Sequence, residues 1–269
     1  MIVATGIELR AGSRLLLDNA TFRIAEGDRV GLVGRNGAGK TTLTKVLARE
    51  AQAAAGSVTS SGEVGYLPQD PRTGDMEVLA RDRILAARGL DEIIRKLRET
   101  EKLMASEDEA VHEKAMRRYT RLDDEFTAQG GYAAESEAAS IASALALDER
   151  ILDQPLRTLS GGQRRRVELS RILFSGASTL LLDEPTNHLD ADSVLWLRDY
   201  LKNYKGGLVI ISHDVAILDS IVNRVFHLDA NPPRWISTTS AGSPISPSVR
   251  RTNDAVSASA RTPRRRPGC

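Results

Sequence analysis

The stretch from Gly34 to Thr41 reads GRNGAGKT and matches the pattern G-x-x-x-x-G-K-[ST]. An apolar run that ends at Val33 precedes it and a helical pattern begins at Lys40, so the stretch connects a strand to a helix. Glycines let such a loop curl until its backbone N–H groups point at a phosphate, and the helix N-terminus adds partial positive charge. A glycine-rich turn without a ligand is the alternative interpretation. With both flanks in place, the pattern predicts a phosphate-binding loop and a nucleotide site.

The side chains of this loop have distinct expected roles. Lys40 would reach the β- and γ-phosphates of the nucleotide, and Thr41 would ligate Mg²⁺. The predicted nucleotide ligands of the loop are Gly34, Asn36, Gly37, Ala38, Gly39, Lys40, Thr41 and Thr42.

Two adjacent carboxylates, Asp183 and Glu184, end a second apolar run in the stretch TLLLDEPTNHLD over 179–190. A buried strand that runs into a solvated acidic turn is one interpretation. Paired like charges are costly, however, unless a cation or a proton transfer uses them. Beside a phosphate loop, Asp183 is expected to hold Mg²⁺ and Glu184 to accept a proton from the attacking water as general base.

The bulk composition excludes several classes of protein. The 269 residues can bury a sizeable core, and no apolar run approaches the length of a membrane span. The N-terminus lacks the layout of a secretory signal, and the only cysteine is Cys269, so a reducing cytoplasm is the expected compartment. Seven arginines and one aspartate from Pro232 onward give that part a charge of +6, which leaves the first 231 residues at −5. Bulk charge therefore gives no case for nucleic-acid binding, which would have to come from local faces.

The order of apolar patterns along the chain predicts an α/β domain. Short strand-like runs occupy residues 2–9, 20–24, 29–33 and 63–67. From Thr158 helices and strands alternate, with helices over 162–174, 192–204 and 214–222 and strands over 179–183, 208–211 and 224–228. Such alternation is typical of a parallel sheet.

Residues from about 82 to 147 interrupt this domain with helical periodicity. The apolar positions at helical spacing are Ile93, Ile94, Leu97 and Met104, and then Val111, Ala115, Tyr119, Leu122 and Phe126. They predict two long helices packed as an antiparallel hairpin, followed by an Ala-rich helix from Tyr132. Lys114, Arg117, Arg118 and Arg121 share one face of the second helix. A phosphate-contacting stripe and a merely solvated face explain that charge pattern equally well.

Leu159-Ser160-Gly161-Gly162-Gln163 stands immediately before the helix predicted over 162–174. A Ser and two glycines at a helix start can bind a phosphate, although alone they are most often only an N-cap. Together with the phosphate loop, with Asp183-Glu184 and with Ser212-His213-Asp214, this segment resembles the ATP-binding cassette superfamily. The resemblance covers residues 1 to about 231, and every motif is present in order.

The resemblance implies an α/β fold: a P-loop NTPase cassette with a parallel-sheet core, an N-terminal antiparallel β subdomain and an inserted α-helical hairpin arm. It implies an ATPase that binds ATP and Mg²⁺ and hydrolyses ATP to ADP and phosphate between two cassettes. The LSGGQ segment of one cassette contacts the γ-phosphate held by the other, which makes Ser160, Gly161, Gly162 and Gln163 nucleotide ligands. It implies that Asp190 belongs to the inter-cassette loop. It also implies a catalytic set of Glu184, His213 and Gln69 and a metal set of Thr41, Gln69 and Asp183.

Asn187-His188-Leu189-Asp190 after Glu184-Pro185-Thr186 looks like the ABC-F branch, and the long interval from Gln69 to Leu159 leaves room for its hairpin. In that branch the proteins are cytoplasmic, do not insert in membranes, and use the hairpin to reach ribosomal RNA or protein. The implied function is an ATPase that acts on translation or protects ribosomes from antibiotics. The alternatives are the ATP-binding subunit of a membrane transporter and a truncated fragment with little activity.

The sequence departs from the family pattern in two places. No Phe, Tyr or Trp precedes Phe22, where the family stacks adenine on an aromatic ring near Leu9–Gly12, which leaves Arg10 or apolar packing to recognise the base. The chain also has one cassette, expected over 1–231, where the branch usually has two. Residues 232–269 are rich in Arg, Ser and Pro and are expected to be disordered. Their abrupt change of composition suggests an out-of-frame end of a two-cassette protein, against a one-cassette protein that pairs with a second copy.

Overall fold

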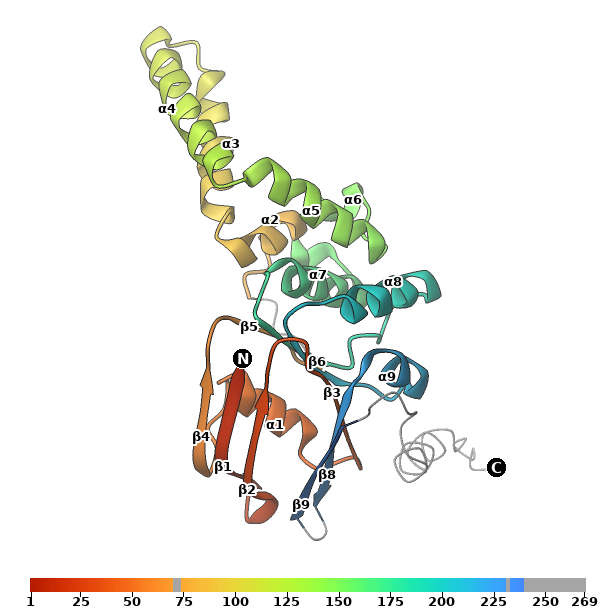
Figure 1. Ribbon diagram of the computed structural model, residues 1–269. Helices are drawn as coiled ribbons and strands as arrows, with labels where there is room; N and C mark the ends of the chain where they lie inside the picture. Colours follow the sequence, from red (N-terminus) through yellow and green to blue (C-terminus); the bar gives the residue numbers. More distant parts are fainter. Residues whose placement is uncertain (70–73, 231–232, 240–269) are drawn as a thin grey trace, which may run out of the picture. The chain divides into compact units, whose positions relative to one another are not determined.

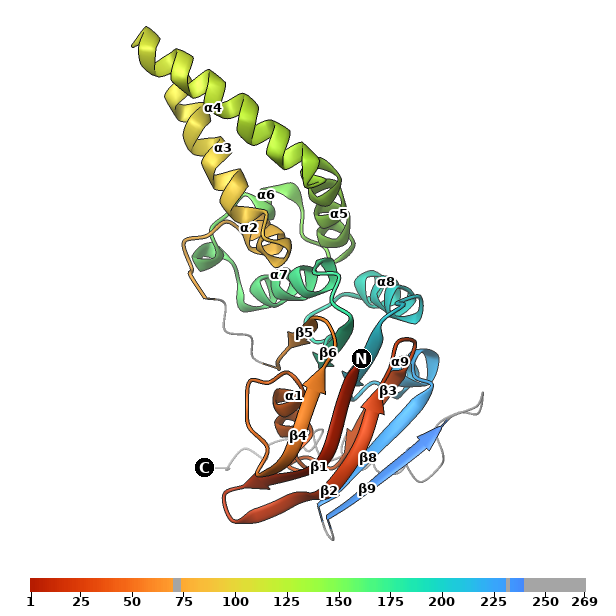
Figure 2. The same cartoon turned by 60° about the vertical axis from the view of Figure 1, so that its left-hand side comes forward.

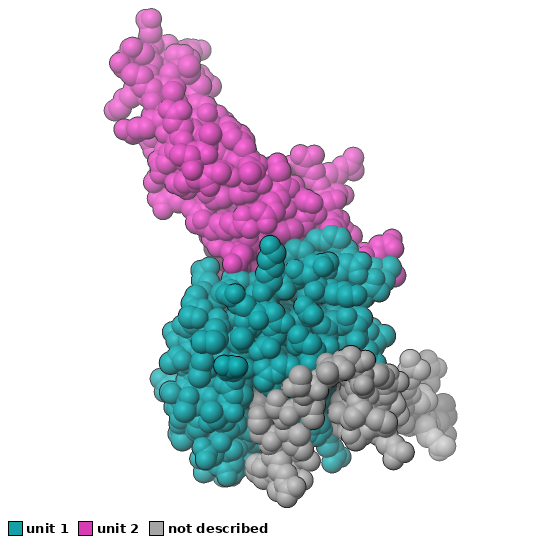
Figure 3. Space-filling view, in the orientation of Figure 1, with its two compact units in different colours: residues 1–69, 177–187, 194–269 teal, residues 70–176, 188–193 magenta. Residues whose placement is uncertain are grey.

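The computed structural model describes residues 1–69, 74–230 and 233–239, and the chain divides into two compact units. Unit 1 comprises residues 1–69, 177–187 and the chain from 194 onward, and unit 2 comprises residues 70–176 and 188–193. Figure 3 colours the two units separately. Helix α8 (Ala191–Lys202) begins in unit 2 and continues in unit 1.

Unit 1 contains two sheets (Figures 1 and 2). The first is antiparallel with the order β2-β1-β4, and its strands are β1 (Ile2–Ala11), β2 (Arg14–Ile24) and β4 (Ala55–Ser60). The second has the order β5-β6-β7-β3-β8-β9 and is parallel except for β9, which pairs antiparallel with β8. Its strands are β3 (Arg29–Gly34), β5 (Val64–Leu67), β6 (Thr179–Asp183), β7 (Gly207–Ile211), β8 (Arg224–Ala230) and β9 (Pro233–Thr239).

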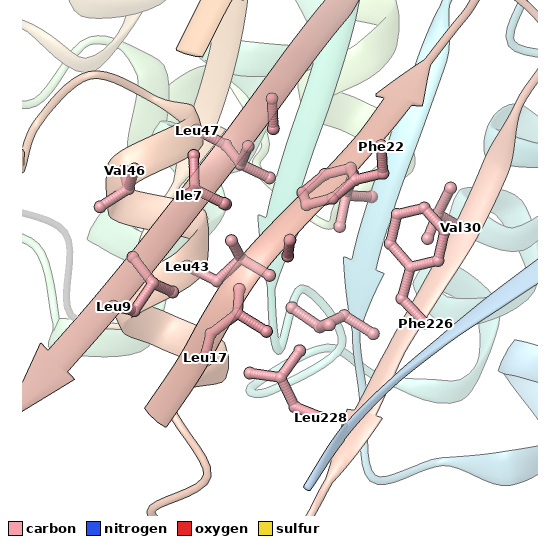
Figure 4. Packing of buried hydrophobic residues seen from close by; sticks show 14 of the residues in the cluster. Ile7, Leu9, Leu17, Phe22, Val30, Leu43, Val46, Leu47, Phe226 and Leu228 are labelled. Carbon is pink, nitrogen blue, oxygen red and sulfur yellow. The ribbon is translucent and has the colours of Figure 1, made fainter. Parts of the chain in front are cut away.

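The hydrophobic core of unit 1 lies where β1 and β2, helix α1 (Lys40–Leu47) and the parallel strands meet, as Figure 4 shows. Its side chains are almost fully buried, and those labelled in Figure 4 are Ile7, Leu9, Leu17, Phe22, Val30, Leu43, Val46, Leu47, Phe226 and Leu228. The rings of Phe22 and Phe226 pack edge to face with centroids 5.2 Å apart, which joins the two sheets. This core fixes α1, and therefore the loop before it, against the sheet.

The parallel strands bring their carboxyl ends to one edge of the sheet. Every residue of β6 and β7 is buried, as expected for strands covered on both faces. Asp183 pairs in register with Ile211, and Gly34 pairs with Leu228. The segments that follow β3, β6 and β7 thus start side by side, which is where open α/β sheets place their ligands.

Unit 2 is helical. Its α-helices are α2 (Ala80–Leu85), α3 (Asp91–Met104), α4 (Glu109–Ala128), α5 (Gly131–Ala144), α6 (Glu149–Leu152) and α7 (Gly161–Phe174), with 3₁₀ turns η1 (Ala86–Arg88) and η2 (Leu156–Thr158). Helices α3 and α4 form an antiparallel hairpin in both views (Figures 1 and 2). Its buried side is formed by Ile93, Ile94, Leu97, Ala115, Leu122 and Phe126. Across the described ranges, no helix combines the length and the apolar character needed to cross a bilayer.

The predicted fold class is confirmed: a parallel-sheet core, an antiparallel β subdomain and an inserted helical hairpin are all present. The structure differs from expectation at three points. Strand β4 was not predicted, because Ala55–Ser60 has small and polar residues with no apolar alternation. Val111 is 37% exposed rather than part of the hairpin core. Pro233–Thr239 form β9 although 232–269 were expected to be disordered, because pairing with β8 supplies hydrogen bonds that composition does not reveal. The expectation for residues 240–269 lies outside the described residues.

Candidate nucleotide-binding site

The loop between β3 and α1 has a backbone that only glycine allows at two positions. A Cβ at Gly34 would lie 2.5 Å from the carbonyl oxygen of Leu228. Gly39, directly before α1, has a φ of +100°, and a Cβ there would lie 2.9 Å from Leu16 Cδ1. The predicted phosphate loop therefore connects strand and helix as its pattern requires, and the N-terminus of α1 faces the same cavity as the loop.

Lys40 crosses the mouth of its own loop. Its Nζ donates to the carbonyl oxygens of Gly34 at 2.9 Å and Arg35 at 3.3 Å. Burial lowers the pKa of the Lys40 ammonium, while the carboxylates of Glu184 and Asp183 act in the opposite direction. The ammonium is thus held at the loop by hydrogen bonds to neutral carbonyl oxygens, which charged phosphate oxygens can replace with stronger ones.

Thr41 and Asp183, far apart in sequence, meet at the ends of α1 and β6. Thr41 Oγ1 donates to Asp183 Oδ2 at 2.8 Å. A hydroxyl and a buried carboxylate at this distance are hard oxygen ligands of the kind that Mg²⁺ takes together with phosphate oxygens and water. The residues present therefore fit the Mg²⁺ that the resemblance implies, and Gln69 lines the same cavity.

Glu184 follows Asp183 with an unusual backbone. Its φ is +51°, which is rare for a non-glycine residue, and its N–H donates to the carbonyl of Ile211 at 2.9 Å. Oε1 lies 3.2 Å from His213 Nε2, and Oε2 accepts from the His213 backbone N–H at 3.3 Å. Burial raises the pKa of the Glu184 carboxyl and Asp183 adds to the rise, whereas His213 and Lys40 oppose it. A buried carboxyl with a raised pKa is the profile of a general base.

One cavity of about 450 Å³ collects these side chains in unit 1. Its lining residues are Ala11, Leu16, Asn36, Gly37, Gly39, Lys40, Thr41, Thr42, Gln69, Asp183, Glu184, Ile211 and His213. Ala11 and Leu16 were not predicted by number; Ala11 ends β1, Leu16 lies near the start of β2, and together they form an apolar wall. Arg10, the other expected contact for the base, is paired with Glu8, with Nε 2.5 Å from Oε1. Two further predicted ligands, Gly34 and Ala38, are not among these lining residues but belong to the same phosphate loop.

The second predicted phosphate-binding segment lies in unit 2, at the start of α7. Ser160 and Gln163 form a reciprocal capping box: Ser160 Oγ accepts from the Gln163 N–H at 3.2 Å, and Gln163 Oε1 accepts from the Ser160 N–H at 2.8 Å. Gly161 and Gly162 form the first turn between them. This geometry is that of an ordinary helix N-cap. It also leaves two small residues at the helix N-terminus, which an anion can approach.

Asp190, predicted for the inter-cassette loop, precedes α8 in unit 2. Its Oδ1 accepts from the Ser193 N–H at 2.8 Å, and this hydrogen bond holds the pKa of the carboxyl below its usual range. Asp190 therefore caps the first turn of α8, which is the role of an N-cap aspartate.

Comparison with known proteins gives three kinds of match. The model of the ABC transporter family matches residues 17–187. The probable ATP-binding protein YheS of Escherichia coli strain K12 is 37% identical over 231 residues, which are 85% of this chain and 34% of YheS. The tylosin resistance ATP-binding protein TlrC of Streptomyces fradiae is 37% identical over 232 residues, 83% of this chain and 41% of TlrC.

The chain thus spans well under half the length of these curated relatives. Among solved structures, a dimeric ATP-binding cassette in a post-hydrolysis state with ADP and Pi superposes with a TM-score of 0.61 and 19% identity, over 90% of this chain and all of that one. This likeness concerns the fold. The family model and the relatives together show that the chain belongs to the ABC transporter family of ATP-binding cassettes, and within it to the ABC-F branch.

Proposed function

We propose that the cavity of unit 1 binds ATP with Mg²⁺ and that Glu184 drives hydrolysis. The observation that supports this proposal is that one cavity is lined by Lys40, Asp183, Glu184 and His213. Lys40 would bind the β- and γ-phosphates. Thr41, Asp183 and Gln69 would hold Mg²⁺, whose charge offsets that of the transferred phosphoryl group.

The geometry around Glu184 supports a hydrolytic step with this residue as general base. Water attacks the γ-phosphorus, its proton passes to a Glu184 oxygen, and the bond from that phosphorus to the bridging oxygen of ADP breaks. Burial raises the pKa of Glu184, which makes the carboxylate a stronger base than an exposed one. His213 lies 3.2 Å from Oε1, so it orients the carboxylate and can contact the γ-phosphate.

We also propose that a second cassette completes the site. The start of α7 offers two glycines and a helix N-terminus to a nucleotide held by another cassette, as the family resemblance implies. A structural neighbour with the same fold is a dimer with ADP and Pi. Asp190 would lie at this contact. A second copy of this chain is one source of such a partner.

The hairpin supports a role on the ribosome in the cytoplasm. Lys114, Arg117, Arg118 and Arg121 are all exposed on α4. Arg117 Nη2 lies 3.3 Å from Glu113 Oε1. Within the described part of the chain, no ion pair is formed by Lys114, Arg118 or Arg121. These cations are available to phosphates. One relative, TlrC, is by name a tylosin resistance protein. That name is compatible with a role in translation and with protection of the ribosome from antibiotics.

Ribosome sedimentation tests this function. Glu184→Gln should retain ATP and therefore pellet with ribosomes in the presence of Mg-ATP, whereas Lys40→Ala, which binds nucleotide weakly, should remain in the supernatant. Failure of the Glu184→Gln protein to pellet, with ATP shown to be bound, would contradict the ribosomal role. Co-fractionation with membranes instead would favour the transporter-subunit alternative.

A further inference from the structure

Helix α7 carries a buried carboxylate about two turns after its capping box. The Glu168 side chain is only 3% exposed. Its Oε1 accepts from Arg83 Nε at 2.6 Å, and its Oε2 accepts from Arg83 Nη2 at 3.3 Å and from Arg171 Nε at 2.9 Å. Arg83 belongs to α2, so this carboxylate joins α2 to the helix that Ser160 begins.

Asp82, the residue before Arg83, forms an ion pair with the first helix of the hairpin, α3. Asp82 Oδ2 lies 2.5 Å from Nη1 of Arg98, which stands in the middle of α3. Neighbouring residues of a helix point about 100° apart, so Asp82 and Arg83 can face different helices. In both views α2 lies at the base of the hairpin beside α7 (Figures 1 and 2). The dipeptide therefore connects the hairpin to α7 within unit 2.

A second connection reaches the far end of α7. Arg88, in the turn η1 that follows α2, donates from Nε to the carbonyl oxygen of Phe174 at 2.7 Å. Its guanidinium lies over the Phe174 ring, 3.9 Å from the centroid, and is bound through two hydrogen bonds to Glu137 of α5 at 2.7 and 2.8 Å. Phe174 is the last residue of α7, so α7 is attached to the hairpin base at its middle and at its end.

Such contacts restrict relative movement more than they add stability. Desolvation of a buried ion pair largely offsets its attraction, but moving Arg83 away would take two of the three hydrogen bonds from the buried Glu168 carboxylate and leave it the one from Arg171. Separation of α2 from α7 is therefore unfavourable. Helix α3 has 14 residues and extends roughly 20 Å from α2, so a small rotation of α2 produces a large displacement at the hairpin tip.

We propose that Asp82 and Arg83 are positioning residues that couple the hairpin to the Ser160–Gly162 segment. When that segment engages a nucleotide on a second cassette, α7 shifts, and the Glu168–Arg83 and Asp82–Arg98 pairs carry the shift into α3. Coupling is reciprocal, so a partner that holds the hairpin biases the engagement of Ser160–Gly162. The inference rests on the proposed pairing of cassettes and adds a route between the two sites.

Hydrogen exchange of the full-length protein tests the coupling without ribosomes. Amide exchange in α3 and α4 is measured with and without a non-hydrolysable ATP analogue and Mg²⁺, and sedimentation velocity on the same samples reports pairing. In the parent protein we expect exchange rates in α3 to change by about fivefold or more on adding the analogue, which corresponds to a change of about 1 kcal/mol in the free energy of local opening. Arg98→Ala should reduce that change to under about twofold, with pairing retained.

The matched control is Arg95→Ala, one turn earlier on α3. Arg95 pairs with Glu92 and Glu99 of the same helix, so its removal takes a cation from α3 without touching α2. The Arg95→Ala protein should keep the nucleotide-dependent change in α3 exchange. Arg98→Lys retains a cation for Asp82, so it should show most of the change that Arg98→Ala loses. A purely structural role for Arg98 would lower the melting temperature and leave the response intact.

The outcomes separate the two proposals. If the parent protein pairs on the analogue but exchange in α3 is unaltered, or if Arg98→Ala responds as the parent does, the coupling is wrong while the proposed function stands. If sedimentation shows no pairing on the analogue, the proposed pairing of cassettes fails and the coupling fails with it.

Discussion

His213 Nε2 lies 3.2 Å from Glu184 Oε1, and the backbone N–H of His213 donates to Glu184 Oε2 at 3.3 Å. One residue thus holds both oxygens of the candidate general base, through its ring and its main chain. The ring is half exposed while the carboxylate is buried. The His213 ring is therefore accessible from the solvent, while the Glu184 carboxylate is enclosed.

Removing the base should stop hydrolysis and spare binding. Glu184→Gln keeps the shape of the side chain but cannot accept a proton. We expect ATP turnover to fall by a factor near the upper end of ~10²–10⁴, with little change in ATP affinity. Turnover assays and equilibrium binding of a labelled ATP analogue check this, with the exposed Glu26→Gln as control. Turnover at the parent rate would show that Glu184 is not the base.

The pH dependence of turnover should report the environment of Glu184. Its pKa is raised chiefly by burial, and the base must be ionised, so turnover should rise with pH over a higher interval than for an exposed carboxyl. His213 opposes the rise, so His213→Gln should move the acid side of the kcat profile to higher pH, apart from any loss of rate. An acid side that stays in place in this variant would contradict the assigned electrostatic contact.

Lys40 should contribute to binding. Lys40→Ala removes an ammonium aimed at the phosphates, and charged hydrogen bonds contribute about 1.5–3 kcal/mol, so Kd for ATP should rise by roughly 10- to 100-fold. Lys45→Ala is the matched control, because Lys45 is an exposed lysine on the same helix. Equal affinities of the two variants would remove the basis for the phosphate-loop assignment.

The basic face of α4 should determine the salt dependence of ribosome binding. Reversal of Arg117, Arg118 and Arg121 to Glu should weaken binding and reduce the slope of log K against log salt by roughly 0.7–0.9 for each phosphate that the hairpin no longer binds. Basal ATP turnover should be unaffected, since these residues are exposed on the hairpin.

Reversal of three exposed cations of unit 1, Arg14, Arg23 and Lys45, provides the comparison for this triple variant. If the hairpin variant keeps the parent slope, the face is merely solvated and the hairpin does not contact phosphates.

An aromatic ring in the apolar wall should tighten base binding. Ala11→Tyr places a ring in the wall that Ala11 and Leu16 form. Base stacking contributes about 1–3 kcal/mol, so the affinity for ATP should rise by roughly 5- to 100-fold. Inorganic tripolyphosphate has no base, so its affinity should be equal for parent and variant. Equal ATP affinity of the two proteins would mean that the adenine lies elsewhere.

The local features of this protein are determined by its sequence. The glycines at 34 and 39 allow a loop that other residues cannot form, and the pattern of Leu, Ile and Val fixes which runs become buried parallel strands. Both patterns can be read from neighbouring positions, although the atoms that exclude a Cβ at 34 and 39 belong to Leu228 and Leu16. For that reason the loop, the strand that ends at Asp183 and the hairpin could all be predicted.

Contacts between distant segments were decided by the tertiary structure. The 2.8 Å hydrogen bond between Thr41 and Asp183 joins residues 142 positions apart, and strand β4 exists because β1 pairs with it. The charge pattern of α2 gave no sign that Asp82 would bind Arg98 while Arg83 binds Glu168. Which of many charged residues pair depends on how helices pack after the chain has folded, because a local pattern contains no information about partners across space.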